Sequence, residues 1–102
     1  MNDRFLNLLG LCKRAGKCAT GFEAAIAALH AKKAAAVFWA YDLSPKTVKE
    51  LRFHADGQEI LHPLTYTKAQ ISAAVGINAG IVAILDPGFA GKALSLKEEL
   101  SI

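Results

Sequence analysis

Ala34-Ala35-Ala36-Val37-Phe38-Trp39-Ala40-Tyr41 is the stretch that decides the fold, because it is apolar from end to end. A strand with one face in water alternates apolar and polar residues, whereas a strand covered on both faces has no polar positions. This stretch therefore predicts a strand at the centre of a sheet, with helices on both sides. Among its aromatic residues, only Tyr41 at the strand end is expected to be exposed.

The rest of the chain alternates predicted helices and strands around this centre. Ile81 to Leu85 is a second apolar run and predicts another buried strand. Short strands are predicted at Cys18 to Thr20 and at Glu59 to Leu61, the latter stopped by Pro63. Apolar residues that recur every three or four positions predict helices over residues 4–15, 22–31, 45–55 and 68–75, with a short last helix from Phe89.

The alternation of helices and strands over 102 residues predicts a single domain of the α/β class, spanning residues 1–102. We expect a three-layer α/β/α sandwich around a small mixed, mostly parallel four-stranded sheet. Polar or charged residues interrupt every apolar run before it reaches bilayer length, and the N-terminus does not resemble a secretory signal. A cytoplasmic protein with no membrane partner is therefore expected.

Several predicted helices are preceded by capping residues. Asp3 precedes the first helix, and Ser44-Pro45 places a capping hydroxyl before a proline at the first helical position. Thr67 to Gln70 has the form of a capping box, in which the two side chains bond each other's exposed amides. Asp86-Pro87-Gly88 is interpreted as a turn that ends the second buried strand.

Gly16-Lys17-Cys18-Ala19-Thr20-Gly21-Phe22-Glu23 is the stretch that suggests a function. Thr20 to Glu23 also has the form of a capping box, so the second helix is expected to present its N-terminus there. A helix N-terminus offers free amide donors and the positive end of a dipole, both of which suit phosphate. Lys13 and Arg14, immediately upstream, would strengthen that preference.

Basic residues are concentrated in the first third of the chain, although the net charge is only +3. Residues 1–33 contain six bases and two acids, whereas residues 34–102 contain six bases and seven acids. This asymmetry is compatible with a polyanionic partner, but a solvated basic face would produce it as well.

Metal, disulfide and enzyme chemistry have little support in the sequence. The two cysteines, Cys12 and Cys18, are expected to be buried reduced thiols. The three histidines lack the paired spacing of metal sites, so neither a metal nor a cofactor is expected. Asp42 and Asp86 each follow a buried strand and could together hold a magnesium ion or act in general acid–base catalysis. An aspartate in such a position is more often a structural turn residue.

Gly76-Ile77-Asn78-Ala79-Gly80 is a connection expected at the same sheet edge as the stretch from Gly16 to Glu23. Together the two segments could form an RNA site, in which helix amides and cations hold phosphates while the connection touches an unstacked base. The alternative is that both are ordinary connections, with Thr20 and Glu23 occupied in capping.

The order and spacing of several short motifs resemble a known family. These motifs are Leu8 to Lys17, Thr20-Gly21, Asp42-Leu43-Ser44 with Thr47, Val75-Gly76-Ile77, and Asp86 to Ala90. Over about Leu6 to Lys92 they resemble the bacterial branch of the ribosomal proteins L-seven-Ae and L-thirty-e. The resemblance implies a three-layer α/β/α domain. It also implies kink-turn RNA binding through Gly21 to Ala27 and Gly76 to Ala79.

The kink-turn binders of this family begin their second helix with Gly-x-Asn-Glu-x-x-Lys, and only Gly21 matches here. Glu23, Ala24 and Ala27 take the places of the Asn, Glu and Lys. The change removes a base-edge donor and a phosphate contact, and it adds a negative charge. What remains suits phosphate and RNA shape better than a base sequence.

The sequence thus favours a non-enzymatic RNA-binding protein of the ribosomal, ribonucleoprotein type, with structured RNA such as ribosomal or kink-turn RNA as its partner. Its candidate RNA-binding residues are Lys13, Arg14, Lys17, Thr20, Gly21, Phe22, Glu23, Gly76, Ile77, Asn78 and Ala79. The main alternative is a protein-interaction scaffold that keeps the fold without kink-turn readout and binds ribosomal or other proteins. The third hypothesis is a metal-dependent enzyme that uses Asp42 and Asp86.

Overall fold

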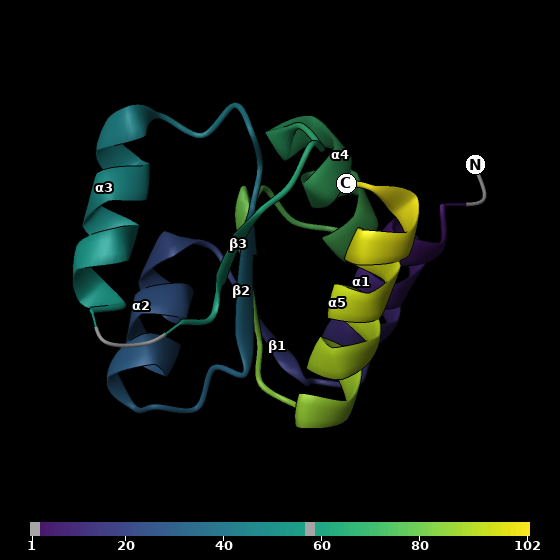
Figure 1. Cartoon of the computed structure of the whole chain (residues 1–102), viewed down its shortest axis with the longest axis horizontal. Helices are drawn as coiled ribbons and strands as arrows, with labels where there is room; N and C mark the ends of the chain where they lie inside the picture. The colour runs from purple at the N-terminus through teal and green to yellow at the C-terminus, as the bar shows by residue number, and fades with distance from the viewer. Residues whose placement is uncertain (1–2, 57–58) are drawn as a thin grey trace.

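The computed structural model describes residues 3–56 and 59–102 and confirms the three-layer α/β/α architecture. Figure 1 shows the sheet between two helical layers, with α2 and α3 on one side and α1, α4 and α5 on the other. In chain order the elements are α1 (Arg4–Arg14), β1 (Cys18–Thr20), α2 (Phe22–His30), β2 (Ala36–Trp39), α3 (Pro45–His54), β3 (Leu61–Pro63), α4 (Lys68–Val75), β4 (Ile81–Ile84) and α5 (Pro87–Leu100). No helix within the described ranges is long and apolar enough to cross a bilayer.

Strand β2 is buried on both faces, as its apolar sequence predicts. Alternate side chains point to opposite helical layers and belong to two separate core clusters. Phe38 packs on the α1 side, where its ring meets that of Phe5 edge to face with centroids 5.4 Å apart. Val37 belongs to the cluster of the other layer, together with Leu51 of α3. Tyr41, just beyond the strand, is 64% exposed, as expected.

The sheet is mixed and four-stranded, as expected, but it is not mostly parallel. Its strand order is β1-β4-β2-β3. β4 pairs antiparallel with both β1 and β2, and only β2 and β3 pair in parallel. β1, β2 and β3 therefore run in one direction and β4 runs in the other. We call the edge at which β1, β2 and β3 end the carboxyl edge, and the edge at which they begin the amino edge.

The direction of β4 follows from the path of the chain around α4. A parallel crossover requires a helix that carries the chain back to the opposite edge. Instead, α4 has eight residues and ends at Gly76, where a φ of +79° reverses the chain. The Tyr41 amide bonds the Tyr66 carbonyl before α4 at 3.0 Å, and the Ala40 amide bonds the Gly80 carbonyl after it at 2.9 Å. The chain therefore approaches and leaves α4 at the carboxyl edge.

Several element boundaries differ from the sequence expectation: β2 is shorter than the apolar run from Ala34 to Tyr41, and β3 and α5 are shifted. β3 covers Leu61–Pro63 and not Glu59 to Leu61. Pro63 is tolerated within it because an edge strand with a single partner does not need every amide in the ladder. α5 starts at Pro87 and runs for 14 residues, so the expectation of a short helix from Phe89 is wrong. Asp86 acts as its N-cap, and the Asp86 carboxylate accepts a hydrogen bond from the Phe89 amide at 2.9 Å.

The other predicted caps are confirmed at α1, α3 and α4. Asp3 accepts from the Leu6 amide at 3.0 Å, and Ser44 accepts from the Thr47 amide at 3.2 Å. Thr67 forms the predicted capping box with the side chain three residues further on. These caps fix where the three helices begin.

Candidate nucleic-acid interface

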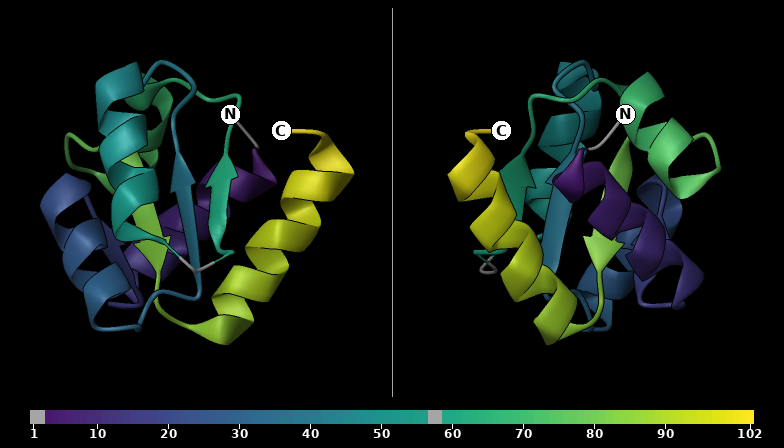
Figure 2. Two further views of the ribbon diagram at one scale, coloured as in Figure 1. Left: turned by 60° about the vertical axis from the view of Figure 1, so that its left-hand side comes forward. Right: turned by 90° about the vertical axis from the view of Figure 1, so that its right-hand side faces the viewer.

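Three helices begin at the carboxyl edge of the sheet. Because β1, β2 and β3 all end there, α2, α3 and α4, which follow them in the chain, start from the same edge (Figures 1 and 2). Helix N-termini carry a partial positive charge and amide donors without intrahelical partners. This edge therefore favours anions through its backbone alone.

A shallow hollow of about 250 Å³ lies at the carboxyl edge and joins the two segments that the sequence analysis singled out. Its lining includes Gly21 and Phe22 at the start of α2, and Asn78 and Ala79 from the connection before β4. The Gly21 amide donates a hydrogen bond to the carbonyl oxygen of Ile81 at 2.9 Å. The prediction that the connection 76–80 lies at the same edge as the start of α2 is confirmed.

The start of α2 differs from the predicted capping box. Thr20 pairs with Val82 inside β1, and Gly21 is the N-cap, with φ +94° and ψ 166°, a conformation open mainly to glycine. Among the described residues, no side chain caps α2, and Glu23 is exposed. The prediction of a capping box between Thr20 and Glu23 is therefore wrong. The first amides of α2 are open to a ligand.

The connection 76–80 is anchored at its base and exposed at its tip. The hydroxyl of Ser72 accepts from the Ala79 amide at 2.9 Å and donates to the Ala79 carbonyl at 3.1 Å. Ala79 is buried, so it shapes the hollow without offering a side chain to a ligand. Ile77 is 44% exposed and Asn78 is also exposed, beyond the turn at Gly76. An exposed apolar side chain suits contact with a base that has left its stack.

Five further residues line the hollow, and none of them is a candidate RNA ligand predicted from the sequence. They are Leu43, Thr47, Lys68, Gly80 and Ile81. Lys68 is exposed at the first position of α4, its amide donates to the Asp42 carboxylate at 2.8 Å, and its side-chain stem packs beside Gly80. The predicted capping box places Lys68 at a helix start. Its nearness to Gly21 depends on the strand order, which local patterns do not encode.

The predicted cations Lys13, Arg14 and Lys17 lie at the amino edge, at the other end of β1. The amide of Leu85, which follows β4, donates to the Lys17 carbonyl at 2.8 Å, and β4 ends at that edge. The three residues of β1 span about 10 Å between Lys17 and Gly21. The structure thus does not bring these cations beside the amides of α2, because an extended strand carries the chain across the sheet between them.

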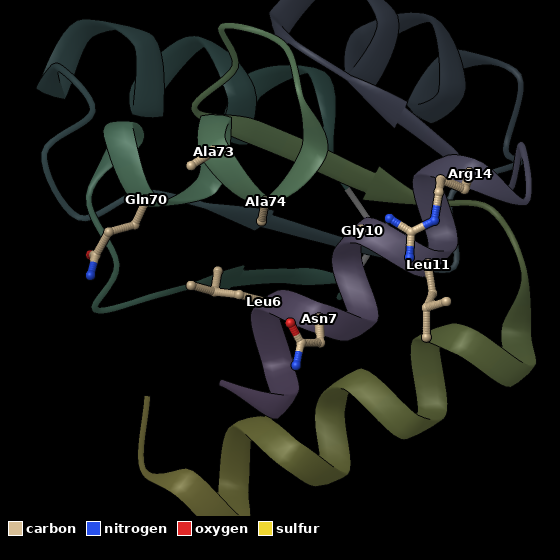
Figure 3. Close-up of a pocket in the computed structure, with 8 residues that line it drawn as sticks. All are labelled: Leu6, Asn7, Gly10, Leu11, Arg14, Gln70, Ala73 and Ala74. Carbon is tan, nitrogen blue, oxygen red and sulfur yellow. The ribbon is translucent and has the colours of Figure 1, made fainter. Parts of the chain in front are cut away.

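Arg14 lines a larger hollow of about 630 Å³ between α1 and α4 (Figure 3). Gly10 lies within it and allows close approach of the two helices. A Cβ at Gly10 would lie 3.0 Å from the Ala74 carbonyl oxygen and 3.4 Å from an Arg14 guanidinium nitrogen. Leu11, which is 51% exposed, also lines this larger hollow. Of the candidate RNA ligands, Arg14 is the one that lines it.

Comparison with known proteins gives one relative with clear sequence identity. The chain is 37% identical over 96 residues to the RNA-binding protein YlxQ of Enterococcus faecium, a match that covers 94% of this chain and 93% of that protein. The chain belongs to the YlxQ family. A scan against family models finds no match.

Solved structures show the same fold. A Bacillus halodurans protein of unknown function superposes with a TM-score of 0.85 at 25% identity, covering 93% of this chain and 97% of that one. The 15.5kD RNA binding protein of Giardia lamblia superposes with a TM-score of 0.72 at 19% identity, covering 94% and 92%. Membership of the YlxQ family and this shared fold support the resemblance to L-seven-Ae and L-thirty-e.

In this YlxQ family member the two aspartates of the enzyme hypothesis lie at opposite edges of the sheet. Asp42 follows β2 at the carboxyl edge and Asp86 follows β4 at the amino edge, because these strands are antiparallel. The paired residues between them span about 10 Å. Asp42 bonds the Lys68 amide, and Asp86 caps α5. The two carboxylates cannot share a metal ion, so the hypothesis of a common site is wrong.

The expectation of two buried reduced thiols is confirmed for Cys12 and wrong in part for Cys18. Cys12 is buried, whereas Cys18 is only half-buried, and both are free. Burial raises the pKa of Cys12 to about 12, with a further contribution from Cys18, so this thiol stays protonated at neutral pH. His30 Nε2 lies 2.9 Å from His54 Nδ1, and this contact joins α2 to α3. Within the described residues, no group of three His, Cys, Asp or Glu side chains could hold a metal ion.

Proposed function

We propose that this member of the YlxQ family binds structured RNA without catalysing a reaction, and that the carboxyl edge is its principal RNA surface. The observation that carries the proposal is the hydrogen bond from Gly21 to Ile81, which sets the open start of α2 beside the connection 76–80. These are the two segments through which the resemblance implies RNA binding. The relative with 37% identity is itself named an RNA-binding protein.

Each part of the hollow has a role suited to its chemistry. The first amides of α2 bind an RNA phosphate, and the space in front of Gly21, where no atom lies within 4 Å of an added Cβ, lets the sugar–phosphate backbone approach. Lys68 adds a positive charge at the rim. Ile77 and Asn78 contact a base that is splayed out of its stack.

Recognition depends on RNA shape more than on base sequence. Glu23 and Ala24 are exposed in the first turn of α2 and offer no side-chain donor to a base edge. A kink-turn or similarly bent RNA presents its backbone and an unstacked base together, which matches the amides and the connection 76–80. We propose such an RNA, within a cytoplasmic ribonucleoprotein such as the ribosome, as the ligand.

The test is a titration of the chain with a kink-turn RNA and with an RNA of the same composition that cannot kink, at two salt concentrations. We expect tighter binding to the kinked RNA and weaker binding at the higher salt concentration, because phosphate contacts release counterions. Absence of binding at low salt would refute the proposal. Recovery of a protein partner that survives nuclease treatment, together with absence of RNA binding, would instead favour the scaffold hypothesis.

A further inference from the structure

Two lysines outside the predicted site, Lys32 and Lys33, lie at the same sheet edge as Lys17. They follow α2 and lead into β2, which begins at the amino edge. The Ala35 amide bonds the Ile84 carbonyl at 2.7 Å, and the Leu85 amide bonds the Lys17 carbonyl at 2.8 Å. The segments that carry Lys17 and Lys33 therefore flank the end of β4 on its two sides, about 10 Å apart, which is two strand spacings.

These cations are not neutralised by neighbouring acids. Between residues that the structure describes, the ion pair within 4 Å is that of Arg4 with Glu99, which does not involve them. Asp86, the acid that follows β4, is engaged as the cap of α5. Lys17, Lys32 and Lys33 are exposed. With the half-buried Lys13 they form a basic surface, which we call the amino-edge cations.

The amino-edge cations are continuous with the proposed RNA surface along one side of the molecule. β1 is an outer strand of the sheet, with Lys17 before it and Gly21 after it. Four residues of extended chain span at most about 14 Å. An RNA held at Gly21 thus reaches the amino edge if its helical stem continues along β1.

We propose that Lys13, Lys17, Lys32 and Lys33 bind the phosphates of an RNA stem that leads away from the segment held at the carboxyl edge. The proposal rests on the proposed function and names a second contact of the same RNA. Lysine is a point charge on a flexible stem and makes phosphate contacts that carry no sequence information. The amino-edge cations therefore add affinity and salt dependence without adding base preference.

A local role makes a different prediction. Cations near the C-terminal ends of α1 and α2 also complement the helix dipoles. If that were their whole purpose, replacing Lys32 and Lys33 would lower the stability of the chain slightly and leave RNA affinity unchanged.

The experiment compares Lys32→Ala/Lys33→Ala with the matched control Lys49→Ala/Lys97→Ala, which removes the same charge from α3 and the far end of α5. Each full-length variant is titrated with two kink-turn RNAs, one with a long flanking stem and one with that stem cut short, over a series of salt concentrations. For the long-stem RNA, we expect the Lys32/Lys33 variant to bind about tenfold more weakly at low salt. Its salt slope should be smaller by about 2. For the short-stem RNA it should match the control.

Equal affinity and salt slope of the two variants on the long-stem RNA would overturn this inference while leaving the proposed function intact, provided that the unaltered chain binds the kink. Absence of binding of the unaltered chain to either RNA would overturn both. Thermal unfolding of each variant separates these outcomes from a loss of fold, because the replaced side chains of Lys32 and Lys33 are exposed.

Discussion

The hydroxyl of Ser72 bonds both backbone groups of Ala79, accepting from its amide at 2.9 Å and donating to its carbonyl at 3.1 Å. This pair of hydrogen bonds ties the connection 76–80 to α4 across seven residues. Because Ala79 lines the hollow at the carboxyl edge and Ser72 does not, the shape of the proposed RNA surface depends on a side chain outside it.

Replacement of Ser72 by Ala should lower the free energy of unfolding by about 1–3 kcal/mol, because the buried backbone groups of Ala79 lose their partner. Urea unfolding measures this change, and amide hydrogen exchange at Ala79 should accelerate. Ser95→Ala, at an exposed position of α5, is the control and should change stability by less than about 0.5 kcal/mol. Unchanged exchange at Ala79 would show that the connection is held by something else.

Glu23 should oppose RNA binding, because its exposed carboxylate lies in the first turn of α2 beside the amides proposed to bind phosphate. Glu23→Gln is expected to tighten RNA binding by about two- to fivefold at low salt, an effect that salt screens. The same change should lower stability by about 0.3–1 kcal/mol, because an acid favours a helix N-terminus. Glu50→Gln, an exposed change of equal charge on α3, should leave RNA affinity unaltered; a matching gain there would indicate a general charge effect.

Tyr66 and Asp3 couple stability to pH through a hydrogen bond of 2.6 Å from the phenol to the carboxylate. Burial, and then the bond to Asp3, raises the pKa of Tyr66 above its usual value near 10. The folded state therefore holds the phenolic proton more tightly than the unfolded chain does, and stability should decline as pH rises above about 10. Tyr66→Phe should make the decline above about pH 10 less steep, and the part that remains comes from the Cys12 thiol, whose pKa burial also raises. Unfolding measurements between pH 8 and 11 would reveal the difference.

The same pair also makes stability depend on pH in the acid range, where stability should fall as the pH is lowered. Burial alone would raise the pKa of Asp3, but hydrogen bonds from Tyr66 and from the amides of Leu6 and Phe5 outweigh it and lower that pKa below 3.8. The stabilisation is thus present above about pH 4 and is lost as the pH falls further. Asp3→Asn should flatten this acid limb. A steeper loss in the variant would contradict the assignment.

Gly10→Ala should destabilise the chain by about 1–3 kcal/mol, although alanine favours helices, because the added Cβ would lie 3.0 Å from the backbone oxygen of Ala74. Gly91→Ala in α5 is the matched control, since nothing lies within 4 Å of its added Cβ. There the helix propensity of alanine should stabilise the chain by about 0.5–1 kcal/mol. Thermal unfolding of the two variants should therefore shift in opposite directions.

Local patterns predicted most elements of this member of the YlxQ family. The apolar run at β2 indicated a strand covered on both faces, and the capping residues Asp3, Ser44 and Thr67 marked three helix starts. These features depend on neighbours within a few positions, which is why the sequence alone sufficed. The capping box at Thr20 failed because β1 pairs with β4, and that pairing holds Thr20 in a strand and makes Gly21 the N-cap.

The candidate site was predicted in part. The two segments that meet at Gly21 and Ile81 were both named from the sequence, but Lys68 was not, and Lys13 and Lys17 were placed beside the wrong feature. The error arises because the three residues of β1 are extended. They place Lys17 and Gly21, which are close in sequence, at opposite edges of the sheet.

By itself, then, the sequence determined the central strand, the helix starts and the presence of a basic first third, because periodicity, capping and charge are local properties. Only the tertiary structure decided that β4 runs against its neighbours and that three helix starts share the carboxyl edge. It likewise decided that the segments carrying Lys17 and Lys33 flank the end of β4 on its two sides. The physical reason is the turn at Gly76, which returns the chain to the edge it came from and thereby sets long-range pairings that no short stretch of sequence encodes.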